Sequence, residues 1–388
     1  MKKSWEEKKL GEACEIEYGT RVVRKRDGGT IYPVYGGGGA TFFMDNYNRE
    51  DCLIVARFAM SEQCTRFVKG KFFLNDSGLT VKPREKIGLL QDFLDLQILF
   101  LNDQIYSLAR GTAQKNLDVT AFRSIVISYP NSFTEQKRIV KILNELFEKI
   151  AKAKENAEKN LQNARELFKS YLQSVFGNSG NDWKEKKLEE VAEVFSGFAF
   201  KSGQFTKVGK YQVIRMGNVR PGLLRIDENP VFIDKIDGKS LSRSLLQRDD
   251  IIITQTGTKK KRDYGYTVAI DKDNYLLNQR LAVIRFPEKF NHRFFLYFSW
   301  SDKFRDQFFA NETGTVGQGN VGIGAVTGAL MPVPKIEKQN RIVAKLDAIS
   351  LEIKKLETIY QQKLACLKEV RKSILQKAFN GELAGIQS

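Results

Sequence analysis

The stretch TEQKRIVKILNEL (residues 134–146) decides the fold, because the chain repeats it about two hundred residues later as IEKQNRIVAKLDAI (residues 336–349). Five positions are identical and keep one spacing. They are Gln136, Arg138, Ile139, Val140 and Leu143, which recur 203 positions later as Gln339, Arg341, Ile342, Val343 and Leu346. A helix opening that occurs twice at constant spacing indicates an internal repeat.

The repeat frames two stretches that do not match. WEEKKLGEACEIEYG (residues 5–19) resembles WKEKKLEEVAEVFSG (residues 183–197), and LQSVFGN (residues 172–178) resembles LQKAFNG (residues 375–381). Between these ends, the middles at residues 20–110 and 198–313 differ in length and sequence. Matched ends around unlike middles indicate one scaffold that carries two different recognition modules.

Each copy of the opening leads into a long amphipathic helix. Apolar residues recur about 3.5 positions apart, and the second copy shows this at Ile342, Leu346, Ile349, Ile353, Leu356 and Tyr360. Such a seam over more than 40 residues is typical of a coiled coil about 60–65 Å long. Two such helices in one chain are expected to pack against each other.

The middles contain short β-like runs separated by turns. CLIVARF (residues 52–58) and RFVKGKFFL (residues 66–74) lie in the first, and DIIITQTG (residues 250–257) and RLAVIRF (residues 280–286) lie in the second. Helical stretches follow near residues 91–101 and 293–309. We therefore predict an α+β protein with two compact α/β modules.

The composition indicates an anionic partner. Lys and Arg number 63 against 46 Asp and Glu, which gives a net charge of +17 and a pI near 9.5. A chain this basic usually binds nucleic acid. The four cysteines form no C-x-x-C pair, the start MKKSWEEKKL has no apolar core, and no stretch is apolar enough to span a bilayer. We expect a cytoplasmic protein with no membrane partner and no structural zinc.

Catalytic patterns are incomplete. His292 is the only histidine, which excludes a His-based triad and a multi-histidine metal site. DGKS (residues 237–240) lacks the first glycine of a phosphate loop, and NPVF (residues 229–232) lacks the second proline of the amino-methyltransferase tetrapeptide. VGQGNVG (residues 316–322) has no matching glycines in the first copy. No catalytic, cofactor or metal site is predicted.

Basic loops and shared amides are the candidate binding residues. KKKRDYGY (residues 259–266) follows a predicted strand, and the two halves share Gly-Thr followed by Gln and Asn. Cations suit phosphates, while Gln and Asn suit base edges or cap a turn. The predicted DNA-contacting residues are Arg21, Arg24, Lys25, Arg26, Arg57, Lys69, Lys71, Arg110, Gln114, Lys115, Arg215, Asn218, Lys259, Lys260, Lys261, Arg262, Tyr264, Gln279 and Gln318.

The order of these segments resembles the specificity subunits of type I restriction–modification systems. The resemblance rests on the W-x-x-x-x-L-x-E start, the GTxQxN segment and the Gln-x-Arg-Ile-Val helix opening, each present twice, with one residue inserted in the second GTxQxN copy. It implies two target recognition domains, separated by two helices that form an antiparallel coiled coil with a pseudo-two-fold axis. The implied boundaries are residues 1–133 and 178–335 for the domains, 134–177 and 336–381 for the helices, and 382–388 for a tail.

The same resemblance implies partners. Each domain recognises one half of an interrupted double-stranded DNA target, and the helices set the spacing and dock two methyltransferase subunits. Restriction subunits with translocase activity join that complex. S-adenosylmethionine, ATP and Mg²⁺ are then expected on the partner chains, and this chain is expected not to be an enzyme.

Two alternatives remain open from the residues alone. One is a coiled-coil scaffold that binds other proteins or RNA, since net charge does not separate DNA from RNA. The other is a fused fragment of a DNA methyltransferase or nuclease, against which the incomplete motifs count.

Overall fold

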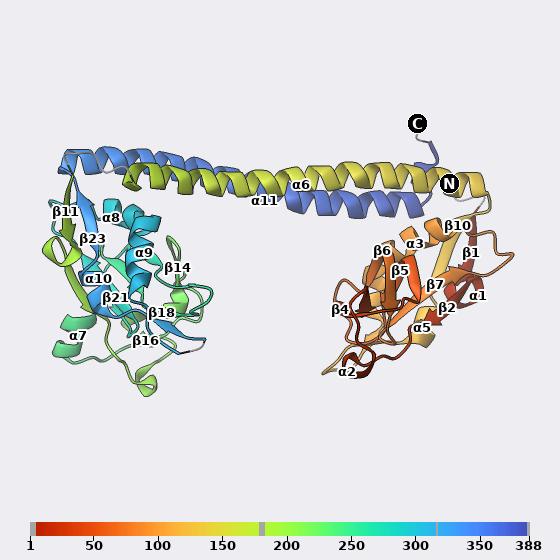
Figure 1. Ribbon diagram of the computed structural model, residues 1–388, viewed down its shortest axis with the longest axis horizontal. Coiled ribbons are helices and arrows are strands. Elements are labelled where there is room, and N and C mark those ends of the chain that lie inside the picture. Colours follow the sequence, from red (N-terminus) through yellow and green to blue (C-terminus); the bar gives the residue numbers. More distant parts are fainter. Residues whose placement is uncertain (1–4, 178–182, 316, 386–388) are drawn as a thin grey trace. The chain divides into compact units, whose positions relative to one another are not determined.

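The computed structural model describes residues 5–177, 183–315 and 317–385 (Figure 1). The chain folds as two compact units. Unit 1 comprises Met1–Glu158 with Gln361–Ser388, and unit 2 comprises Lys159–Tyr360. Each unit therefore contains one α/β head and one part of each long helix, α6 (Phe133–Gly177) and α11 (Ile336–Phe379).

The head of unit 1 is built on a six-stranded sheet in the order β2-β7-β5-β6-β3-β4. Its neighbours are antiparallel except for the parallel pair β3 and β6. These strands are β2 (Cys14–Tyr18), β3 (Tyr32–Gly36), β4 (Gly39–Met44), β5 (Arg49–Ala56), β6 (Thr65–Leu74) and β7 (Gly78–Pro83). Around them lie α1 (Leu10–Ala13), α2 (Arg24–Asp27), α3 (Gln91–Phe100), α4 (Asn102–Ser107), α5 (Val119–Arg123), the pair β1 (Trp5–Lys9) and β10 (Val126–Pro130), and the pair β8 (Ala109–Arg110) and β9 (Asn116–Leu117).

The head of unit 2 has two smaller sheets. Four strands follow the order β12-β21-β17-β19 and three follow β16-β13-β20, in which β13 and β20 are parallel. The strands are β11 (Lys184–Lys187), β12 (Glu193–Ser196), β13 (Tyr211–Ile214), β14 (Val219–Arg220), β15 (Leu223–Leu224), β16 (Phe232–Ile233), β17 (Ile251–Thr254), β18 (Thr256–Gly257), β19 (Thr267–Ala269), β20 (Tyr275–Leu277), β21 (Leu281–Arg285), β22 (Gly319–Asn320) and β23 (Leu330–Val333). The helices are α7 (Gly238–Ser244), α8 (His292–Ser299), α9 (Asp302–Ala310), α10 (Ile323–Thr327) and the short 3-10 turns η1 (Leu188–Glu190), η2 (Ser202–Gln204) and η3 (Met216–Asn218), with η4 (Glu382–Gly385) in unit 1.

The central strand of each head is covered on both faces, which explains the apolar runs Ile251–Ile253 and Leu53–Ala56. In β17, Ile251 and Ile253 join the core under α8 and α9, while Ile252 points into a second core. In β5, Val55 and Ile54 divide in the same way between two cores. Successive side chains of a strand point to opposite faces, so a strand buried on both sides needs apolar residues throughout.

The two long helices are in contact and run antiparallel. In unit 1, residues 139–143 at the start of α6 pack with residues 375–379 at the end of α11, and the Arg371 guanidinium lies 4.9 Å from the centre of the Phe147 ring. In unit 2, the end of α6 meets the start of α11, and Arg165 forms a 2.7 Å ion pair with Glu357. The predicted fold class, two α/β modules joined by two long paired helices, is confirmed. The domain boundaries stay a prediction.

The repeated glutamine is explained by its burial. Gln136 is fully buried, and its Nε2 donates to the carbonyl oxygens of Gly88 and Pro130, each at 2.7 Å. Its Oε1 accepts from the backbone nitrogen of Leu90 at 2.8 Å. The side chain thus satisfies three backbone groups of the segments that precede α3 and α6.

Gln339 has the same hydrogen-bonding role in unit 2. It is buried, donates to the carbonyl oxygen of Pro334 at 2.9 Å and accepts from the backbone nitrogen of Asn291 at 3.0 Å. One amide therefore fixes the angle at which each head joins its long helix, because buried backbone groups need partners. This constraint accounts for the identical residue in both copies.

The repeat continues inside the heads, where the sequences no longer match. Asn75 follows β6 and its nitrogen donates to the carbonyl oxygen of Tyr35, at 2.9 Å, while Asn278 follows β20 and donates to Ile214 at 3.0 Å. Both asparagines stand at the end of the one parallel strand pair of their head. They lie 203 positions apart, the same offset as the helices.

We predict that the unfolding free energy of unit 1 depends on pH through Asp95 in α3. Asp95 is buried beside Gln91, whose Nε2 donates to its Oδ1 at 2.7 Å, and burial raises the pKa of Asp95 to about 6. The folded state then holds this proton more tightly than the unfolded state, whose carboxyl has a pKa of about 4. The stabilisation is complete below that value and is lost as pH rises through about 6.

The measurement is chemical denaturation of the parent and of Asp95→Asn between pH 4 and 7.5. The parent should lose stability relative to the variant as pH rises, since the amide of the variant stays neutral throughout. Exposed Glu85, in the turn before α3, supplies the control, and Glu85→Gln should follow the parent. Parallel curves for the parent and Asp95→Asn contradict the prediction.

Candidate nucleic-acid interface

Each head presents one glycine-bent loop with the shared Gly-Thr sequence. Gly111 has φ of +109° and Gly314 has φ of +110°, a region that side chains with a Cβ rarely adopt. A Cβ at Gly111 would collide with the carbonyl oxygen of Gln114, and one at Gly314 with that of Gln318. The two loops share this geometry, and both glutamine side chains are exposed at their tips.

In unit 1 the loop gathers several predicted residues. Its strands pair Arg110 with Asn116, and the backbone of Leu117 donates to the carbonyl oxygen of Arg57 at 2.8 Å. The Arg57 guanidinium lies between the rings of Tyr18 and Phe58, 4.7 and 4.5 Å from their centres. The structure thus places Arg57 and Arg110 against one loop.

Lys115 and Arg110 reach outward from that loop. The Lys115 ammonium donates to the Tyr106 hydroxyl at 3.0 Å, and Arg110 pairs with Asp118 at 2.6 Å. The Arg110 side chain is still 80% exposed, so its charge is available to a ligand. Together with Gln114, these residues form an exposed polar and cationic edge.

The other predicted cations of unit 1 form a separate group. Arg24, Lys25 and Arg26 lie in the short helix α2, after Arg21 in the preceding loop, and α2 lies on the side of unit 1 remote from α6 (Figure 1). The ion pair with Arg26 helps to lower the pKa of Asp27.

Lys69 and Lys71 lie on β6. The Lys71 ammonium lies 4.5 Å from the centre of the Tyr47 ring, and a hydrogen bond with the Tyr47 side chain raises the pKa of Lys71. The loop after α2 is tied to the β4–β5 connection, because Thr30 donates to Asp45 at 2.8 Å. Among the described residues, no bond links this α2 and β6 group to the glycine-bent loop.

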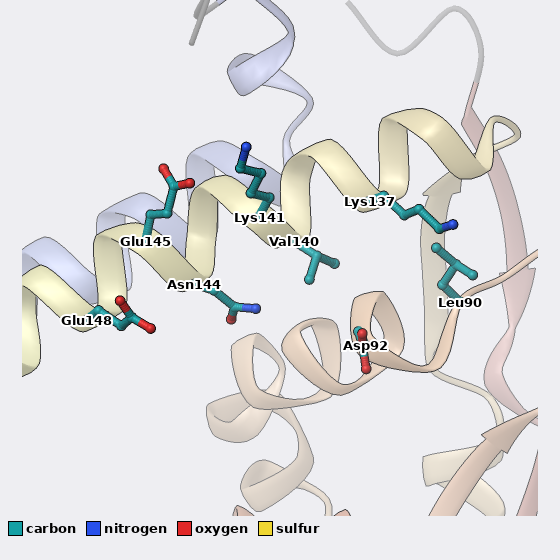
Figure 2. Close-up of a pocket in the computed structure, with 8 residues that line it drawn as sticks. All are labelled: Leu90, Asp92, Lys137, Val140, Lys141, Asn144, Glu145 and Glu148. Atoms are coloured by element: carbon teal, nitrogen blue, oxygen red, sulfur yellow. The ribbon is translucent and has the colours of Figure 1, made fainter.

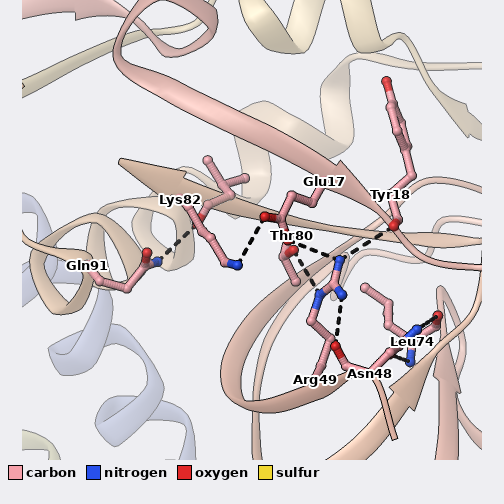
Figure 3. Close-up of polar contacts among 9 residues, drawn as sticks. Glu17, Tyr18, Asn48, Arg49, Leu74, Thr80, Lys82 and Gln91 are labelled. Carbon is pink, nitrogen blue, oxygen red and sulfur yellow. Dashed lines mark hydrogen bonds and ion pairs between the residues drawn. The ribbon is translucent and has the colours of Figure 1, made fainter. Parts of the chain in front are cut away.

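Not every cation of the sheet is free to bind DNA. Figure 3 shows Arg49 enclosed by Glu17, Thr80 and the backbone of Asn48. Arg49 pairs with Glu17 at 3.2 Å, and Lys82 pairs with the same carboxylate at 3.0 Å. These charges hold neighbouring strands together and neutralise one another.

In unit 2 the turn of residues 259–262 (the KKKR turn) contacts the glycine-bent loop. The Lys259 ammonium donates to the carbonyl oxygen of Gly314 at 3.3 Å, and β18 pairs with β22. Asp263 closes the turn by accepting from the Thr258 nitrogen at 2.6 Å, a bond that lowers the pKa of Asp263. Lys260 and Lys261 are exposed, and the Arg262 guanidinium lies 4.8 Å from the centre of a phenylalanine ring.

Two predicted contact residues are buried and serve the fold instead. Tyr264 is fully buried and its hydroxyl bonds to Glu312, which raises its pKa together with burial. Asn218 is 4% exposed, donates to the carbonyl oxygens of Arg225 and Glu228, and accepts from the Arg215 nitrogen at 3.0 Å. The polar atoms of both side chains are bonded within the fold, so neither belongs to the interface proposed below.

Arg215 and Gln279 come together at one hollow of about 460 Å³ in unit 2. Arg220 and Arg280 line the same hollow, although the sequence did not single them out. The sequence did not predict a role for Arg220 and Arg280, because isolated arginines in a segment without a repeat match no motif. Only the fold brings the three guanidinium groups to one place.

A hollow in unit 1, between α3 and the start of α6, has a different character. It measures about 390 Å³ and is lined by Asp92, Lys137, Lys141, Glu145 and Glu148 among others. Figure 2 shows Lys137 reaching toward Leu90, while Lys141 and Glu145 project from another face of α6. Three acids against two lysines do not make a phosphate-binding surface.

The described part of the chain contains no cluster of three or more His, Cys, Asp or Glu side chains placed to hold a metal ion. His292 is half-buried at the start of helix α8, and burial lowers its pKa. In the same described residues, no helix is both long enough and apolar enough to cross a membrane.

Comparison with known proteins agrees with this architecture. Residues 2–160 and 180–363 match the family described as "Type I restriction modification DNA specificity domain". The chain is 27% identical over 311 residues to the type I restriction enzyme MjaVIII specificity subunit of Methanocaldococcus jannaschii, which covers 74% of this chain and 72% of that one. It is 25% identical over 305 residues to the EcoKI specificity subunit of Escherichia coli, covering 72% and 62%.

Two solved structures share the fold. A chain from a structure of complex assembly and conformational transition in a type I R-M system gives a TM-score of 0.74 at 17% identity, over 97% of this chain and 98% of that one. The HsdS subunit from Thermoanaerobacter tengcongensis gives 0.54 at 18% identity, over 98% of each chain.

Two α/β heads joined by two paired long helices define the architecture of a DNA specificity subunit. The chain belongs to the type I restriction–modification DNA specificity family. It is the subunit that recognises the target sequence, and it is the non-catalytic part of such a system.

Proposed function

We propose that each head binds one half of an interrupted duplex DNA target, and that the paired helices set the distance between the halves. One observation carries this proposal. The two heads place the same glycine-bent loop at equivalent positions but surround it with different side chains. Two loops of the same geometry can be placed in the same way on the two half-targets. The different side chains around the loops can then recognise different base sequences.

In this proposal the contacts divide by chemistry. Arg57, Arg110 and Lys115 of unit 1, and the lysines of the KKKR turn of unit 2, contact phosphates. Gln114 and Gln318 extend from the loop tips toward base edges, because their exposed amides offer a donor and an acceptor. The group Arg21, Arg24, Lys25, Arg26, Lys69 and Lys71 contacts phosphates farther from the loop of unit 1.

We further propose that two methyltransferase subunits dock on the paired helices and that restriction subunits join them. The relative that supplies the complex structure assembles in a type I R-M system, which supports this assignment. S-adenosylmethionine, ATP and Mg²⁺ then belong to the partner chains. A system that acts on cellular and invading DNA operates in the cytoplasm, where we place this chain.

Replacing Lys259, Lys260 and Lys261 by glutamine should weaken binding to every duplex and flatten its salt dependence. Each lost phosphate contact lowers the slope of log K against log salt by about 0.9, so the triple variant should lose roughly two to three units. Competition binding at several salt concentrations, on the complex with methyltransferase subunits, measures both effects.

The matched control removes the same charge elsewhere on unit 2. Lys207, Lys235 and Lys239 are exposed and lie outside the KKKR turn. Their triple glutamine variant should keep most of the affinity and slope. If the two triple variants behave alike, the turn does not contact phosphates.

A further inference from the structure

The two heads carry a pair of adjoining turns at equivalent positions. One turn follows the first strand of the parallel pair, at Gly36–Gly39 in unit 1 and Arg215–Asn218 in unit 2. The other begins at Asn75 and Asn278, whose nitrogens bond back to the end of that first strand. Both turns stand at the carboxyl end of a parallel strand pair, a place where α/β folds commonly bind ligands.

In unit 1 the two turns are packed together. A Cβ at Gly36 would collide with the side chains of Ser77 and Asn75, and the nitrogen of Gly37 donates to the Ser77 hydroxyl at 3.3 Å. The glycines therefore let the turns close on each other.

In unit 2 an arginine replaces the first glycine, and the hollow of about 460 Å³ lies between the turns. Arg215 donates to the carbonyl oxygen of Asn229 at 2.6 Å, and Arg220 donates to those of Gly217 and Val219 at 3.0 and 2.9 Å. Backbone carbonyls fix these guanidinium groups without neutralising them. Glu228 also lines the hollow, but its carboxylate pairs with Arg225 at 2.7 Å. Among the described residues, neither these two arginines nor Arg280 forms an ion pair with a carboxylate.

Several polar groups at the hollow lack partners. The Nε of Arg215 and the Oδ1 of Asn278 are buried without a hydrogen bond. The side chains of Gln279 and Arg280 are exposed and make no hydrogen bond within the part of the chain that is described. Buried polar atoms without partners are costly in a folded protein, so a site with two of them suits a polar ligand.

Arg280 also holds a backbone conformation that favours glycine. Its φ is +69°, in the left-handed region where a Cβ is strained. Backbone strain of this kind clusters at functional sites, and in this chain seven other described residues that are not glycine also have a positive φ. An exposed arginine kept at such a position, at the edge of a cationic hollow, indicates a binding role.

We propose that this hollow is the base-recognition site of unit 2. Gln279 and Arg280 are its specificity-determining residues, and Arg215 and Arg220 bind the adjoining phosphate. A glutamine amide matches the adenine edge and a guanidinium matches the guanine edge in the major groove. At the equivalent turn unit 1 has Asp76 and Ser77, and Ser77 closes the turn against Gly37, so the two heads present different groups at this place. This inference rests on the proposed function.

The test uses Arg280→Gly in the complex with methyltransferase subunits. Glycine relieves the backbone strain, so the thermal unfolding midpoint should not fall. Discrimination between the preferred duplex and duplexes with one altered base pair in the unit 2 half should fall roughly 10- to 100-fold at one position. Discrimination in the unit 1 half should stay as in the parent.

A second variant keeps the test decisive if the first one misfolds. Gln279→Ala truncates an exposed side chain without partners and should lose discrimination at a neighbouring position. Lys239→Ala on α7, an exposed lysine away from the hollow, is the control and should change neither half.

The outcomes separate this inference from the proposed function. Suppose that the parent distinguishes the preferred duplex from duplexes with one altered base pair, and that both variants keep the parent's affinity ratios. The hollow is then not the base-recognition site, and the proposed function stands. If the parent shows no preference for any interrupted duplex, the proposed function fails and this inference fails with it.

Discussion

Exchange of residues 198–313 for the corresponding segment of another family member changes one half of the recognised target and leaves the other half as it was. The reason lies in how the cores are divided. The three apolar cores of unit 2 draw on residues between 168 and 346, and none of them includes a residue of the unit 1 head. A new module can therefore fold on the same helix ends without disturbing the first head.

The effect should be large, because each altered base pair costs roughly 1–3 kcal/mol and separate positions nearly add. Three changed base pairs in one half-target thus shift preference by roughly 3–9 kcal/mol, or about two to six orders of magnitude. Sequencing of methylated sites, in DNA exposed to the complete modification complex, measures both halves at once. The reciprocal exchange of residues 20–110 should change the other half. Simultaneous change of both halves in either chimera would falsify the modular assignment.

Substitution of Gln136 by leucine should sharply destabilise unit 1. Leucine matches the volume of the amide but leaves the nitrogen of Leu90 and the oxygens of Gly88 and Pro130 buried without partners. An unsatisfied buried group costs about 1–3 kcal/mol, so a loss of roughly 3–5 kcal/mol is expected. Denaturant unfolding, followed with hydrogen exchange to assign the transition to unit 1, gives the value.

Two comparisons sharpen that measurement. Gln339→Leu removes two bonds instead of three and should destabilise unit 2 by a smaller amount. Lys137→Leu, at the neighbouring exposed position, should leave the stability of unit 1 nearly unchanged. Equal stability of Gln136→Leu and the parent contradicts the role assigned to the repeated glutamine.

The long helices and the two heads were predictable because their pattern repeats. The five identical positions between Gln136 and Leu143 depend on contacts that each unit makes in the same way, and the 3.5-residue spacing follows from helix packing. The shared Gly-Thr loop was also predictable, since only glycine suits the φ of Gly111 and Gly314.

The details of the interface were less accessible. The equivalence of Asn75 and Asn278 lies in backbone hydrogen bonds, which any residue can form, so it left little trace in the sequence. Tyr264 was predicted to contact DNA because it lies close to four cations, yet the turn directs its ring into the core. Arg280 gave no signal because its importance depends on a φ angle and on neighbours far away in the chain.

The placement of Leu375, Ala378 and Phe379 in the core of unit 1 has a consequence for synthesis of the protein. Unit 2 is one continuous segment and is complete as soon as residue 360 has left the ribosome. Unit 1 must wait for a part of α11 that is translated about two hundred residues after its head, a delay of roughly 10–40 s at usual elongation rates. The head of unit 1 is therefore translated first, but its core is completed last. Until then its apolar surface needs protection from aggregation.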